Sequence, residues 1–393
     1  MIPFEEALAR VFALTPVIDT EVLALGQAAG RVLRAPVVAE RDQPPFASSA
    51  MDGYALAGGA APSASLRVIG EAPAGRAFAG RIDPGAALRI FTGAPLPEGA
   101  DRVVIQEDVT REGDVIILHE VPAKGSHIRP RGKDFRAGDR VSAPRRLRAP
   151  DLALLAAMNC ARVTVSRRPD VAIIATGDEL VMPGETPRGD QIIASNAFAL
   201  QALAEAEGAT ARVLPIAKDS EASLRAVFDL AAGADIIVTI GGASVGDHDL
   251  VGPVSEAMGA SRAFYKVAMR PGKPLMAGRL GASMLLGLPG NPVSSIVCGH
   301  LFLRPVLRAM QGLGAYPLPS QSATLAVDLP ANGPRMHFMR ATLGPDHTII
   351  PLPDQDSSLL SVLCAADALL IRPVQDPARK AGEATRYIPL RPC

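Results

Sequence analysis

The strongest constraint on the fold is an alternation of apolar, strand-like runs with helical periodicity across residues 169–313. Strands are expected at 171–175, 212–216 and 235–240, and helices are expected at 196–207, 221–231 and 250–258. Strand runs that are apolar nearly throughout, rather than at alternate positions, are typical of a parallel sheet covered by helices on both faces. The sequence therefore predicts an α/β domain with a mostly parallel sheet over residues 169–313.

The flanking segments carry other patterns, which together predict a multidomain protein built of α/β and β domains. Short β-rich runs between Gly, Pro and Asp turns predict an inserted all-β domain over residues 53–142 and a small C-terminal β-domain over 317–393. Helical spacing at 4–14 and again after the insertion predicts a helical linker domain formed by residues 1–52 and 143–168.

The charge balance and the cysteines exclude several classes of function. Lys plus Arg number 40 and Asp plus Glu number 40, so a formal net charge of zero gives no basis for broad nucleic-acid binding. The four cysteines lie far apart and form no Cys-x-x-Cys pair, which indicates neither a zinc knuckle nor a disulfide framework. We therefore expect a cytoplasmic protein that does not bind nucleic acid.

Neither a signal peptide nor a membrane span is expected. The N-terminus carries Glu5 and Glu6 where a signal peptide carries basic residues. Residues 283–303 contain no Asp, Glu, Lys or Arg, but the turn from Pro289 to Pro292 interrupts this stretch. We expect a buried strand, a loop and a helix there, and no membrane partner.

The loop at 175–180 places polar residues directly after the first apolar strand. In an open parallel sheet, ligands bind beyond the carboxyl ends of the strands, so such loops are the candidate site. Thr176 is followed by Asp178 and Glu179, and paired carboxylates at an apolar strand end require a cation, a metal or a proton. The alternative is a solvated turn with a threonine cap.

The loop after the third predicted strand is rich in glycine and polar residues. Gly241 and Gly242 allow the backbone to approach a phosphate. Ser244 can donate a hydrogen bond, while Asp247 and Asp249 could hold Mg²⁺. The loop is neither a Walker A sequence nor a Gly-x-Gly-x-x-Gly sequence, and a tight turn without a ligand is the alternative.

A basic turn follows at residues 269–274. Arg270 and Lys273 lie in a turn that contains two prolines, and Lys266 adds a third cation nearby. Fixed cations beside a glycine-rich loop are suited to an oxyanion or a pyrophosphate. The alternative is a solvated basic turn.

The loop at 287–294 ends an apolar run and begins a helix. Pro289, Asn291 and Ser294 lie in this turn and at the first helical positions, where the helix N-terminus could accept an anion. Each of the four loops is ambiguous alone, but four polar strand-end loops in one α/β domain together predict a ligand site.

Six motifs taken together resemble the MoeA-type molybdopterin molybdenumtransferases, the family that includes the C-terminal domain of gephyrin. The motifs follow the order of that family, and the resemblance covers nearly the whole chain. They are Ser-Ala-Met-Asp-Gly-Tyr-Ala at 49–55, Thr-Gly-Ala-Pro at 92–95, Ala-Thr-Gly-Asp-Glu-Leu at 175–180, Gly-Gly-Ala-Ser-Val-Gly-Asp at 241–247, Arg-Pro-Gly-Lys-Pro at 270–274 and Gly-Leu-Pro-Gly-Asn-Pro-Val-Ser at 287–294.

The resemblance implies an enzyme of molybdenum cofactor biosynthesis. Such an enzyme receives adenylylated molybdopterin, hydrolyses the adenylate with Mg²⁺, releases AMP and inserts molybdate at the dithiolene sulfurs. The resemblance also implies a cytoplasmic homodimer, with molybdopterin adenylyltransferase as the upstream partner. In that homodimer, N-terminal acids of the partner subunit complete the cleft of the α/β domain.

The resemblance further assigns roles to single residues. The implied catalytic positions are Asp52, Thr92, Asp134 and Glu179, with Glu179 and Asp134 as metal ligands. Arg270 stands where the family often has lysine. Residues 354–361 depart from the family's Gly-containing Ser-Gly run, and this departure bears on the roles of Arg335 and Arg340 in the same C-terminal domain. From the loops and the resemblance together, the expected substrate-binding positions are Thr176, Asp178, Gly241, Gly242, Ser244, Asp247, Asp249, Lys266, Arg270, Lys273, Pro289, Asn291 and Ser294.

Two alternative functions fit parts of the sequence. The Thr-Gly-Asp-Glu and Gly-Gly-x-Ser loops also resemble the smaller molybdopterin adenylyltransferases, but that activity requires only the α/β domain and leaves both β-domains unexplained. A non-catalytic scaffold like gephyrin in its receptor-clustering role is the second alternative. It predicts an exposed peptide-binding groove.

Overall fold

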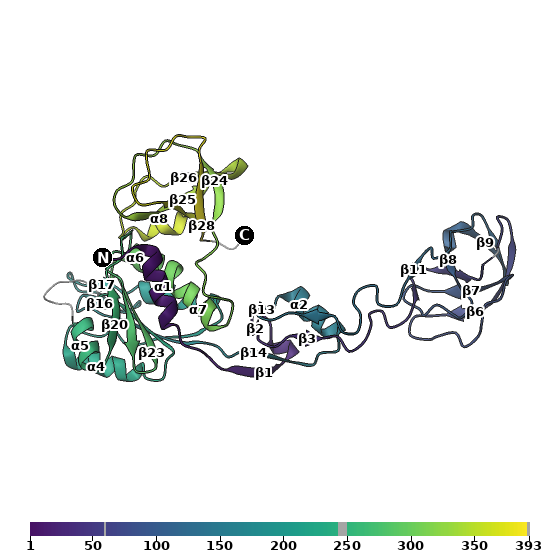
Figure 1. Ribbon diagram of the computed structural model, residues 1–393, viewed down its shortest axis with the longest axis horizontal. Helices are drawn as coiled ribbons and strands as arrows, with labels where there is room; N and C mark the ends of the chain where they lie inside the picture. The colour runs from purple at the N-terminus through teal and green to yellow at the C-terminus, as the bar shows by residue number, and fades with distance from the viewer. Residues whose placement is uncertain (59, 243–249, 391–393) are drawn as a thin grey trace.

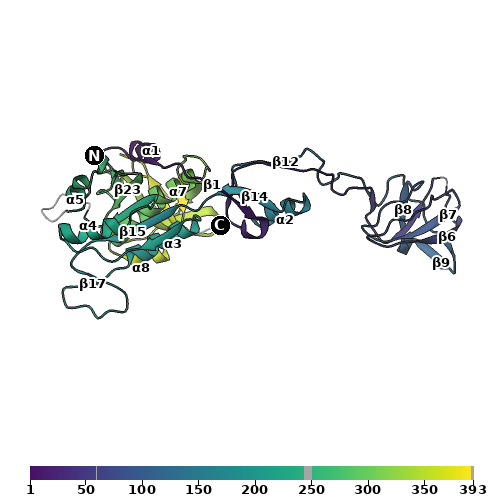
Figure 2. The same ribbon diagram turned by 90° about the horizontal axis from the view of Figure 1, so that it is seen from below.

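The computed structural model describes residues 1–393 apart from 59, 243–249 and 391–393. Figures 1 and 2 show an elongated molecule, with the α/β and C-terminal domains at one end, a small linker domain in the middle and the inserted β-domain at the far end. Its accessible surface is 18541 Å². A compact monomer of this length exposes roughly 14,700 Å². The extended shape therefore leaves a large excess of surface in contact with solvent.

The central sheet confirms the predicted α/β domain. Its strand order is β18-β15-β19-β23-β22-β20, in which the first four strands are parallel to one another and β22 is antiparallel to both of its neighbours, β23 and β20. The strands are β15 (Asp170–Ala175), β18 (Thr210–Val213), β19 (Ile236–Ile240), β20 (Ser261–Tyr265), β22 (Met276–Leu280) and β23 (Ser283–Leu288).

Helices cover both faces of this sheet, as the apolar strands predict. Along β15, Val171 and Ile173 belong to one core while Ala172 and Ile174 belong to another. The first core is covered by α3 (Asn196–Ala206) and by the apolar helix formed by α6 (Pro292–Cys298), the π-turn η3 (Gly299–Leu303) and α7 (Arg304–Met310). The second core is covered by α4 (Glu221–Leu230) and α5 (Val251–Ala257).

The uncharged stretch at 283–303 forms the predicted strand, loop and helix. The helix from Pro292 to Met310 is long and apolar enough to cross a membrane, but 78% of its apolar window is buried inside the protein. Packing in the core of the α/β domain therefore accounts for its apolar character.

The predicted helix near the N-terminus exists but does not belong to the linker domain. Helix α1 (Phe4–Leu14) packs Ala7, Leu8 and Val11 into the core of the α/β domain. Phe4 meets the ring of Phe302 at 5.4 Å between centroids. Helix α1 also packs against α7 and the strands β20 and β22, which sequence periodicity alone does not identify.

The linker domain is mainly a sheet, so its prediction as a helical domain is wrong. Its strands β1 (Thr20–Ala24), β14 (Arg162–Ser166), β2 (Val32–Leu33) and β13 (Arg145–Arg146) pair in that order. Besides the single-turn η1 (Leu25–Gln27), the described part of this domain contains one helix, α2 (Ala149–Ala157). Alternating residues such as Val163 and Val165 enter its core, which favours strands because β-branched side chains pack well on a pleated sheet.

The inserted β-domain is a six-stranded sheet with the order β8-β5-β7-β6-β10-β9. Two antiparallel chain segments connect it to the linker domain, where Gln43 N–H donates to Phe135 O at 2.8 Å and Asp134 N–H donates to Gln43 O at 2.9 Å. The strands of this sheet are β5 (Gly53–Leu56), β6 (Ser65–Ala72), β7 (Ala86–Ile90), β8 (Arg102–Ile105), β9 (Val109–Glu112) and β10 (Val115–Leu118), with η2 (Gln106–Asp108) between β8 and β9. Two separate pairs lie outside the sheet: β4 (Ser48–Ser49) with β11 (Ile128–Arg129), and β3 (Val37–Val38) with β12 (Arg140–Val141).

The C-terminal domain is the predicted small β-domain, and its sheet closes on itself. The order is β21-β25-β26-β24-β28-β27, and β27 also pairs with β25. Strand β21 (Met269–Arg270) comes from the basic turn of the α/β domain, so it ties the two domains together. The other elements are β24 (Gln321–Leu325), β25 (Met336–Leu343), η4 (Pro345–His347), β26 (Thr348–Pro351), α8 (Leu360–Ala365), β27 (Ala368–Arg372) and β28 (Ala384–Pro389).

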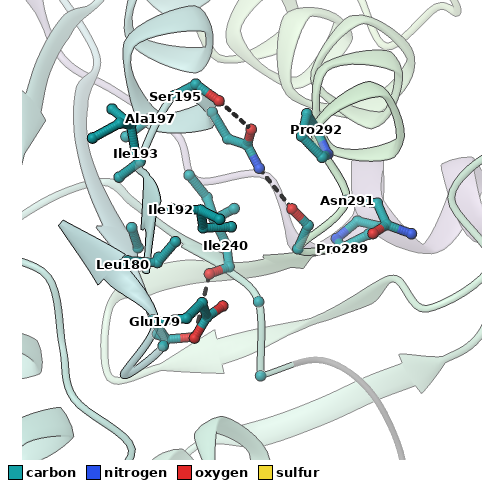
Figure 3. Close-up of a pocket in the computed structure, with 18 of the residues that line it drawn as sticks. Glu179, Leu180, Ile192, Ile193, Ser195, Ala197, Ile240, Pro289, Asn291 and Pro292 are labelled. Atoms are coloured by element: carbon teal, nitrogen blue, oxygen red, sulfur yellow. Dashed lines mark hydrogen bonds between the residues drawn. The ribbon is translucent and has the colours of Figure 1, made fainter. Parts of the chain in front are cut away.

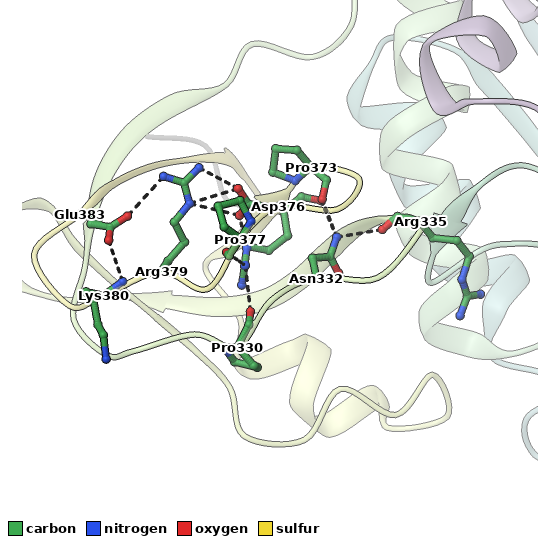
Figure 4. A network of polar contacts seen from close by, with 10 residues as sticks. Pro330, Asn332, Arg335, Pro373, Asp376, Pro377, Arg379, Lys380 and Glu383 are labelled. Atoms are coloured by element: carbon green, nitrogen blue, oxygen red, sulfur yellow. Dashed lines mark hydrogen bonds and ion pairs between the residues drawn. The ribbon is translucent and has the colours of Figure 1, made fainter.

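A buried ion pair anchors the loop between β27 and β28 (Figure 4). Arg372 Nε lies 2.6 Å from Asp376 Oδ2, and both side chains are 4% exposed. Arg379 also pairs with Asp376, at 2.7 Å. Burial raises the pKa of Asp376, but the hydrogen bonds from Arg379 and Arg372 outweigh burial and bring the pKa below its ordinary value. The carboxylate is therefore charged at neutral pH.

We predict that Asp376→Asn lowers the free energy of unfolding by about 3 kcal/mol, because it leaves Arg372 buried without a counter-charge. Since the folded pKa of Asp376 is lowered, its contribution is present above the unfolded pKa of roughly 3.9 and is lost as the pH falls through the folded value. Urea unfolding at pH 7 and at pH 3 measures both effects.

The matched control for this prediction is Asp328→Asn, which removes an exposed carboxylate paired with Lys380 in the same domain. Its effect on stability should be small because exposed ion pairs contribute little. Equal losses of stability for the two variants would contradict a special role for the buried pair.

Candidate functional site

A cavity of about 640 Å³ lies at the carboxyl ends of the parallel strands (Figure 3). The residues that line it come from the loops after β15, β19 and β23, from the short strands β16 (Leu180–Val181) and β17 (Ile192–Ile193), and from the start of α3. Among the predicted site residues, those that line this cavity are Thr176, Glu179, Gly241, Gly242, Pro289 and Asn291.

The floor of this cavity is backbone from two neighbouring strand ends. Thr176 N–H donates to Ile240 O at 3.0 Å, and the Thr176 hydroxyl donates to the same oxygen at 3.2 Å. Gly242 has a φ of +61°, and a Cβ there would lie 2.3 Å from a methyl group of Val251. Glycine is therefore required for the backbone to lie this close to Val251 of α5.

The two neighbouring acids of the first loop point in different directions. Glu179 lines the cavity and is exposed. Asp178 is not among the lining residues, but its carboxylate Oδ1 accepts the N–H of Asp219, which does line the cavity, at 3.2 Å. Asp178 therefore adjoins the cavity through Asp219, and its predicted role in substrate binding stays a prediction.

The wall of the cavity formed by Ile192 and Ile193 was not predicted from the sequence. Figure 3 shows Ile192 and Ile193 on one side of the cavity, with Pro289 and Asn291 on the other. Ile192 is 59% exposed, so it presents apolar surface to the cavity. In the sequence, the apolar pairs at 180–181 and 192–193 are the feature that could have indicated this wall.

Side-chain hydrogen bonds join this wall to the fourth predicted loop. Ser195 Oγ–H donates to Asn196 Oδ1 at 3.2 Å, and Asn196 Nδ2–H donates to Gly290 O at 2.7 Å. Helix α3 therefore holds the Pro289–Pro292 turn in place, and Figure 3 shows both bonds.

A second cavity, of about 310 Å³, lies between the α/β domain and the C-terminal barrel. Three cationic side chains line it, Arg270, Lys273 and Arg335, against the single carboxylate of Asp356. The charge of the lining therefore favours an anion. Its remaining lining residues are Pro271, Gly272, Pro274, Asn291, Ser294, Gln355 and Ser357.

Gly272 sets the shape of the basic turn. Its φ is +103°, and a Cβ there would lie 2.5 Å from Cys298 Sγ on α6. Glycine is thus needed for the turn to lie against the helix, which brings Lys273 beside Ser294 in the lining of the cavity. Lys266 is not among the residues that line either cavity; its ammonium lies 5.1 Å from the ring centroid of Tyr265.

A fully buried arginine lies behind the second cavity. Arg340 is 0% exposed, and its Nη2 donates to the backbone oxygens of Asp354 at 3.2 Å and Asp356 at 3.0 Å. Its Nε and Nη1 have no partner among the described residues. Burial lowers the pKa of Arg340 from that of a free arginine, and the charge of Arg270 lowers it further. Arg340 thus holds the 354–356 loop in position and adds positive charge near the cavity.

The two cavities share a wall. Asn291 lines both, and its Nδ2–H donates to Ser357 Oγ at 3.1 Å. Val293 N–H donates to Ser357 O at 3.0 Å, so the C-terminal loop is fixed to the start of α6. Sequence periodicity gave no indication of this contact, because it joins loops that lie far apart in the chain.

Three of the four predicted catalytic residues lie away from the cavities in the same chain. Asp52 and Thr92 flank β5 and β7 of the β-domain, and the Asp52 carboxylate accepts both Thr92 N–H and the Thr92 hydroxyl at 2.7 Å. These bonds, with the Thr92 N–H first, lower the pKa of Asp52. Asp134 lies on the connection between the linker domain and the β-domain. Figure 1 shows this β-domain at the opposite end of the molecule from β23.

One chain therefore does not bring the two predicted metal ligands, Glu179 and Asp134, together. Among residues outside 59, 243–249 and 391–393, no group of three or more His, Cys, Asp or Glu is arranged to hold a metal ion. Three predicted substrate-binding residues, Ser244, Asp247 and Asp249, lie outside the described residues.

Comparison with known proteins gives one family along the whole chain. The family models of the MoeA N-terminal region (domain I and II), the probable molybdopterin binding domain and the MoeA C-terminal region (domain IV) match residues 2–159, 172–309 and 322–390. The molybdopterin molybdenumtransferase of Nostoc sp. is 40% identical over 318 residues, covering 77% of this chain and 73% of that protein. The molybdopterin molybdenumtransferase of Haemophilus influenzae is 35% identical over 346 residues, covering 86% and 85%.

A solved structure shares the fold over its full length. The molybdopterin biosynthesis MoeA protein of Pyrococcus horikoshii superposes with a TM-score of 0.83 at 28% identity, covering 100% of both chains. The matched regions account for the linker and β-domains, the α/β domain and the barrel together. This chain therefore belongs to the family of MoeA-type molybdopterin molybdenumtransferases, enzymes of molybdenum cofactor biosynthesis.

Proposed function

We propose that the larger cavity binds the pterin nucleotide of adenylylated molybdopterin and that the smaller, cationic cavity binds molybdate. The observation that carries this proposal is the shared wall at Asn291, which places a cationic pocket directly beside a pocket of nucleotide size. Molybdate held in one cavity can then reach the dithiolene of a ligand held in the other. Hydrolysis of the adenylate releases AMP and leaves the pterin carrying the metal.

The smaller cavity has the chemistry that an oxyanion requires. Arg270 and Arg335 offer planar, fork-shaped donors, and Lys273 offers a point charge. Hydrogen bonds from charged donors are roughly twice as strong as those between neutral groups. Ser294, which is 4% exposed, adds a hydroxyl to the same lining.

The larger cavity combines features suited to a pterin nucleotide. Its volume of about 640 Å³ lies within the range of small-ligand pockets, roughly 300 to 1,000 Å³. Ile192 and Ile193 offer an apolar surface for a ring, while the backbone of Gly241 and Gly242 in the same lining offers a place for phosphate. Glu179 is an exposed residue of the same lining, and its carboxylate can orient an attacking water.

We propose that the active unit is a homodimer in which the β-domain of one subunit supplies Asp52 and Thr92 to the larger cavity of the other. The distance of the β-domain from its own α/β domain supports this arrangement, as does the large exposed surface of the single chain. The hydrogen bonds from Thr92 hold the Asp52 carboxylate ionised and in one orientation at the surface of the β-domain.

Mg²⁺ fits the donors that this arrangement would gather. Carboxylate oxygens are the protein ligands that Mg²⁺ prefers, and Glu179 and Asp134 are both exposed carboxylates. When bound, Mg²⁺ supplies neutralisation of phosphate charge. The residues of this chain hold the ligand and orient water.

A cytoplasmic location and an upstream molybdopterin adenylyltransferase complete the proposal, since the substrate carries an adenylate that another enzyme must attach. The activity of the smaller adenylyltransferases needs only the α/β domain, so it does not account for the matched regions at 2–159 and 322–390. A molybdenumtransferase accounts for all three regions. A scaffold role without turnover does not explain the cationic cavity.

We predict that Lys273→Ala weakens molybdate binding by about 2 kcal/mol, roughly thirtyfold in Kd, because one charged donor is lost from the cavity. Lys266→Ala is the control, since Lys266 lies on the same segment but outside the lining. Calorimetric titration with molybdate measures both. Equal affinities for the two variants would remove Lys273 from the oxyanion site.

We predict that Glu179→Gln lowers kcat by at least tenfold, because the variant keeps the shape of the side chain but loses the carboxylate that orients water. The melting temperature should stay within about 2 °C, because Glu179 is exposed. Glu185→Gln, an exposed neighbour outside the cavity lining, is the control. Normal turnover of Glu179→Gln would exclude this role.

We predict that Asp52→Asn and Glu179→Gln subunits complement each other. Each homodimer should have little activity, but the heterodimer should have one complete site, formed by Glu179 of the Asp52→Asn subunit and Asp52 of the Glu179→Gln subunit. A heterodimer purified by two different tags should therefore show about half of the wild-type activity. An inactive heterodimer would reject sharing of residues between subunits.

A further inference from the structure

The linker domain and the α/β domain meet through polar contacts rather than through a common apolar core. Among the residues that the structure describes, the core of the linker domain and the core containing α1 and α3 have no member in common. Across the joint, the Ser166 hydroxyl of β14 donates to Gln311 O at 2.7 Å. Arg146 of β13 contacts Glu207, which follows α3.

Glu207 is the centre of this joint. Its side chain is 5% exposed and lies near guanidinium groups from both domains. Arg304 Nη2 of α7 is 2.8 Å from Glu207 Oε1, and Arg146 Nη2 is 3.1 Å from Oε2. Arg308, also on α7, lies further away at 3.9 Å. One buried carboxylate thus connects α3 and α7 of the α/β domain to β13 of the linker domain.

The position of Arg146 is fixed by more than one contact. Its Nη2 donates both to the carboxylate and to the backbone oxygen of Glu207, each at 3.1 Å, and its Nη1 donates to Gly30 O at 3.2 Å. Gln311 Nε2–H donates to the same Glu207 backbone oxygen at 2.7 Å. Arg146 is therefore bound to two oxygens of Glu207 in the α/β domain and to one backbone oxygen of its own linker domain. These hydrogen bonds restrict rotation of the linker domain about the joint.

The shape of the molecule magnifies any rotation at this joint. Both views show β6 to β9 at the far end of the linker domain, with the joint between β14 and α7 at the near end. A small change of angle at Arg146 therefore becomes a large displacement of Asp52 and Thr92. Misplacement of a reacting group by about 1 Å can cost a hundredfold in rate.

We propose that the Arg146–Glu207 contact is a positioning device for catalysis, which sets the direction of the β-domain so that Asp52 and Thr92 reach the cavity of the partner subunit. This inference rests on the proposed sharing of residues between subunits. Arg146 and Glu207 are positioning residues, since neither lines a described cavity.

The test uses Arg146→Gln with a matched neighbour as control. Arg146→Gln removes the linker side of the contact and leaves Glu207 paired with Arg304. The control is Arg145→Gln, on the same strand, because Arg145 pairs with Asp151 inside the linker domain at 3.3 Å. Each substitution is placed separately in the two subunits of the Asp52→Asn and Glu179→Gln heterodimer.

The expected result depends on the subunit that carries the change. In the Glu179→Gln subunit, whose β-domain serves the one complete site, Arg146→Gln should lower kcat by roughly ten- to a hundredfold. In the Asp52→Asn subunit, whose β-domain is already inactive, the same change should leave the activity of the heterodimer unaltered. Arg145→Gln should have no effect in either subunit.

The possible outcomes separate this inference from the proposed function. An inactive parent heterodimer would overturn the sharing of residues and this inference with it. An active parent in which Arg146→Gln acts equally in both subunits, or in neither, would overturn the inference alone. Small-angle X-ray scattering gives an independent readout, because Arg146→Gln should broaden the distribution of interatomic distances and Arg145→Gln should not. Identical profiles for the two variants would contradict the positioning role.

Discussion

Burial of both faces of the central parallel sheet is the constraint on which the rest of the structure depends. Along β15, successive side chains enter two separate cores, so neither face of the strand is available for polar chemistry. Polar groups can reach solvent only where the strands end. The loops after β15, β19 and β23 consequently meet at one edge, and the larger cavity is the space between them. The opposite edge of the sheet offers no free carboxylate at these strand starts, because Asp170 pairs with Arg212 and Asp235 pairs with Arg167.

The barrel adds what the sheet edge lacks, which is a concentration of positive charge. Strand β21 leaves the α/β domain to pair with β25, so Arg270 is held by both domains. Arg340, on β25, holds the backbone of the 354–356 loop from behind. A buried arginine with two unpartnered nitrogens is costly in a folded protein. Its cost is reasonable if the charge serves the anion cavity, since preorganised charge requires no rearrangement when the ligand binds.

Much of the fold and part of the site follow from the sequence, because their signals are local. Continuous apolar runs indicate a buried parallel sheet, and Gly241, Gly242 and Gly272 mark turns whose φ excludes other residues. The linker domain was mispredicted because β1 pairs with β14, a partner far along the chain that no local pattern reveals. Loop contacts such as Asn291 with Ser357 depend on domain packing for the same reason. Asp178 and Lys266 are charged residues close to the strand-end loops in the sequence, but neither lines a cavity. The direction of each side chain depends on its neighbours in space, which are Asp219 for Asp178 and the ring of Tyr265 for Lys266.

The polar character of the linker joint follows from the task of holding a long arm in one direction. An apolar contact is stabilised in proportion to buried area and has no preferred angle, so two apolar surfaces can slide while losing little free energy. A guanidinium bound to a carboxylate and a backbone oxygen is directional, because both hydrogen bonds weaken steeply as the angle changes. Burial of Glu207 adds to this effect, since a lower local dielectric strengthens the pair and makes its separation expensive. A joint of this kind contributes little area to stability but much to orientation, which is what a distant β-domain requires if its side chains act on another subunit.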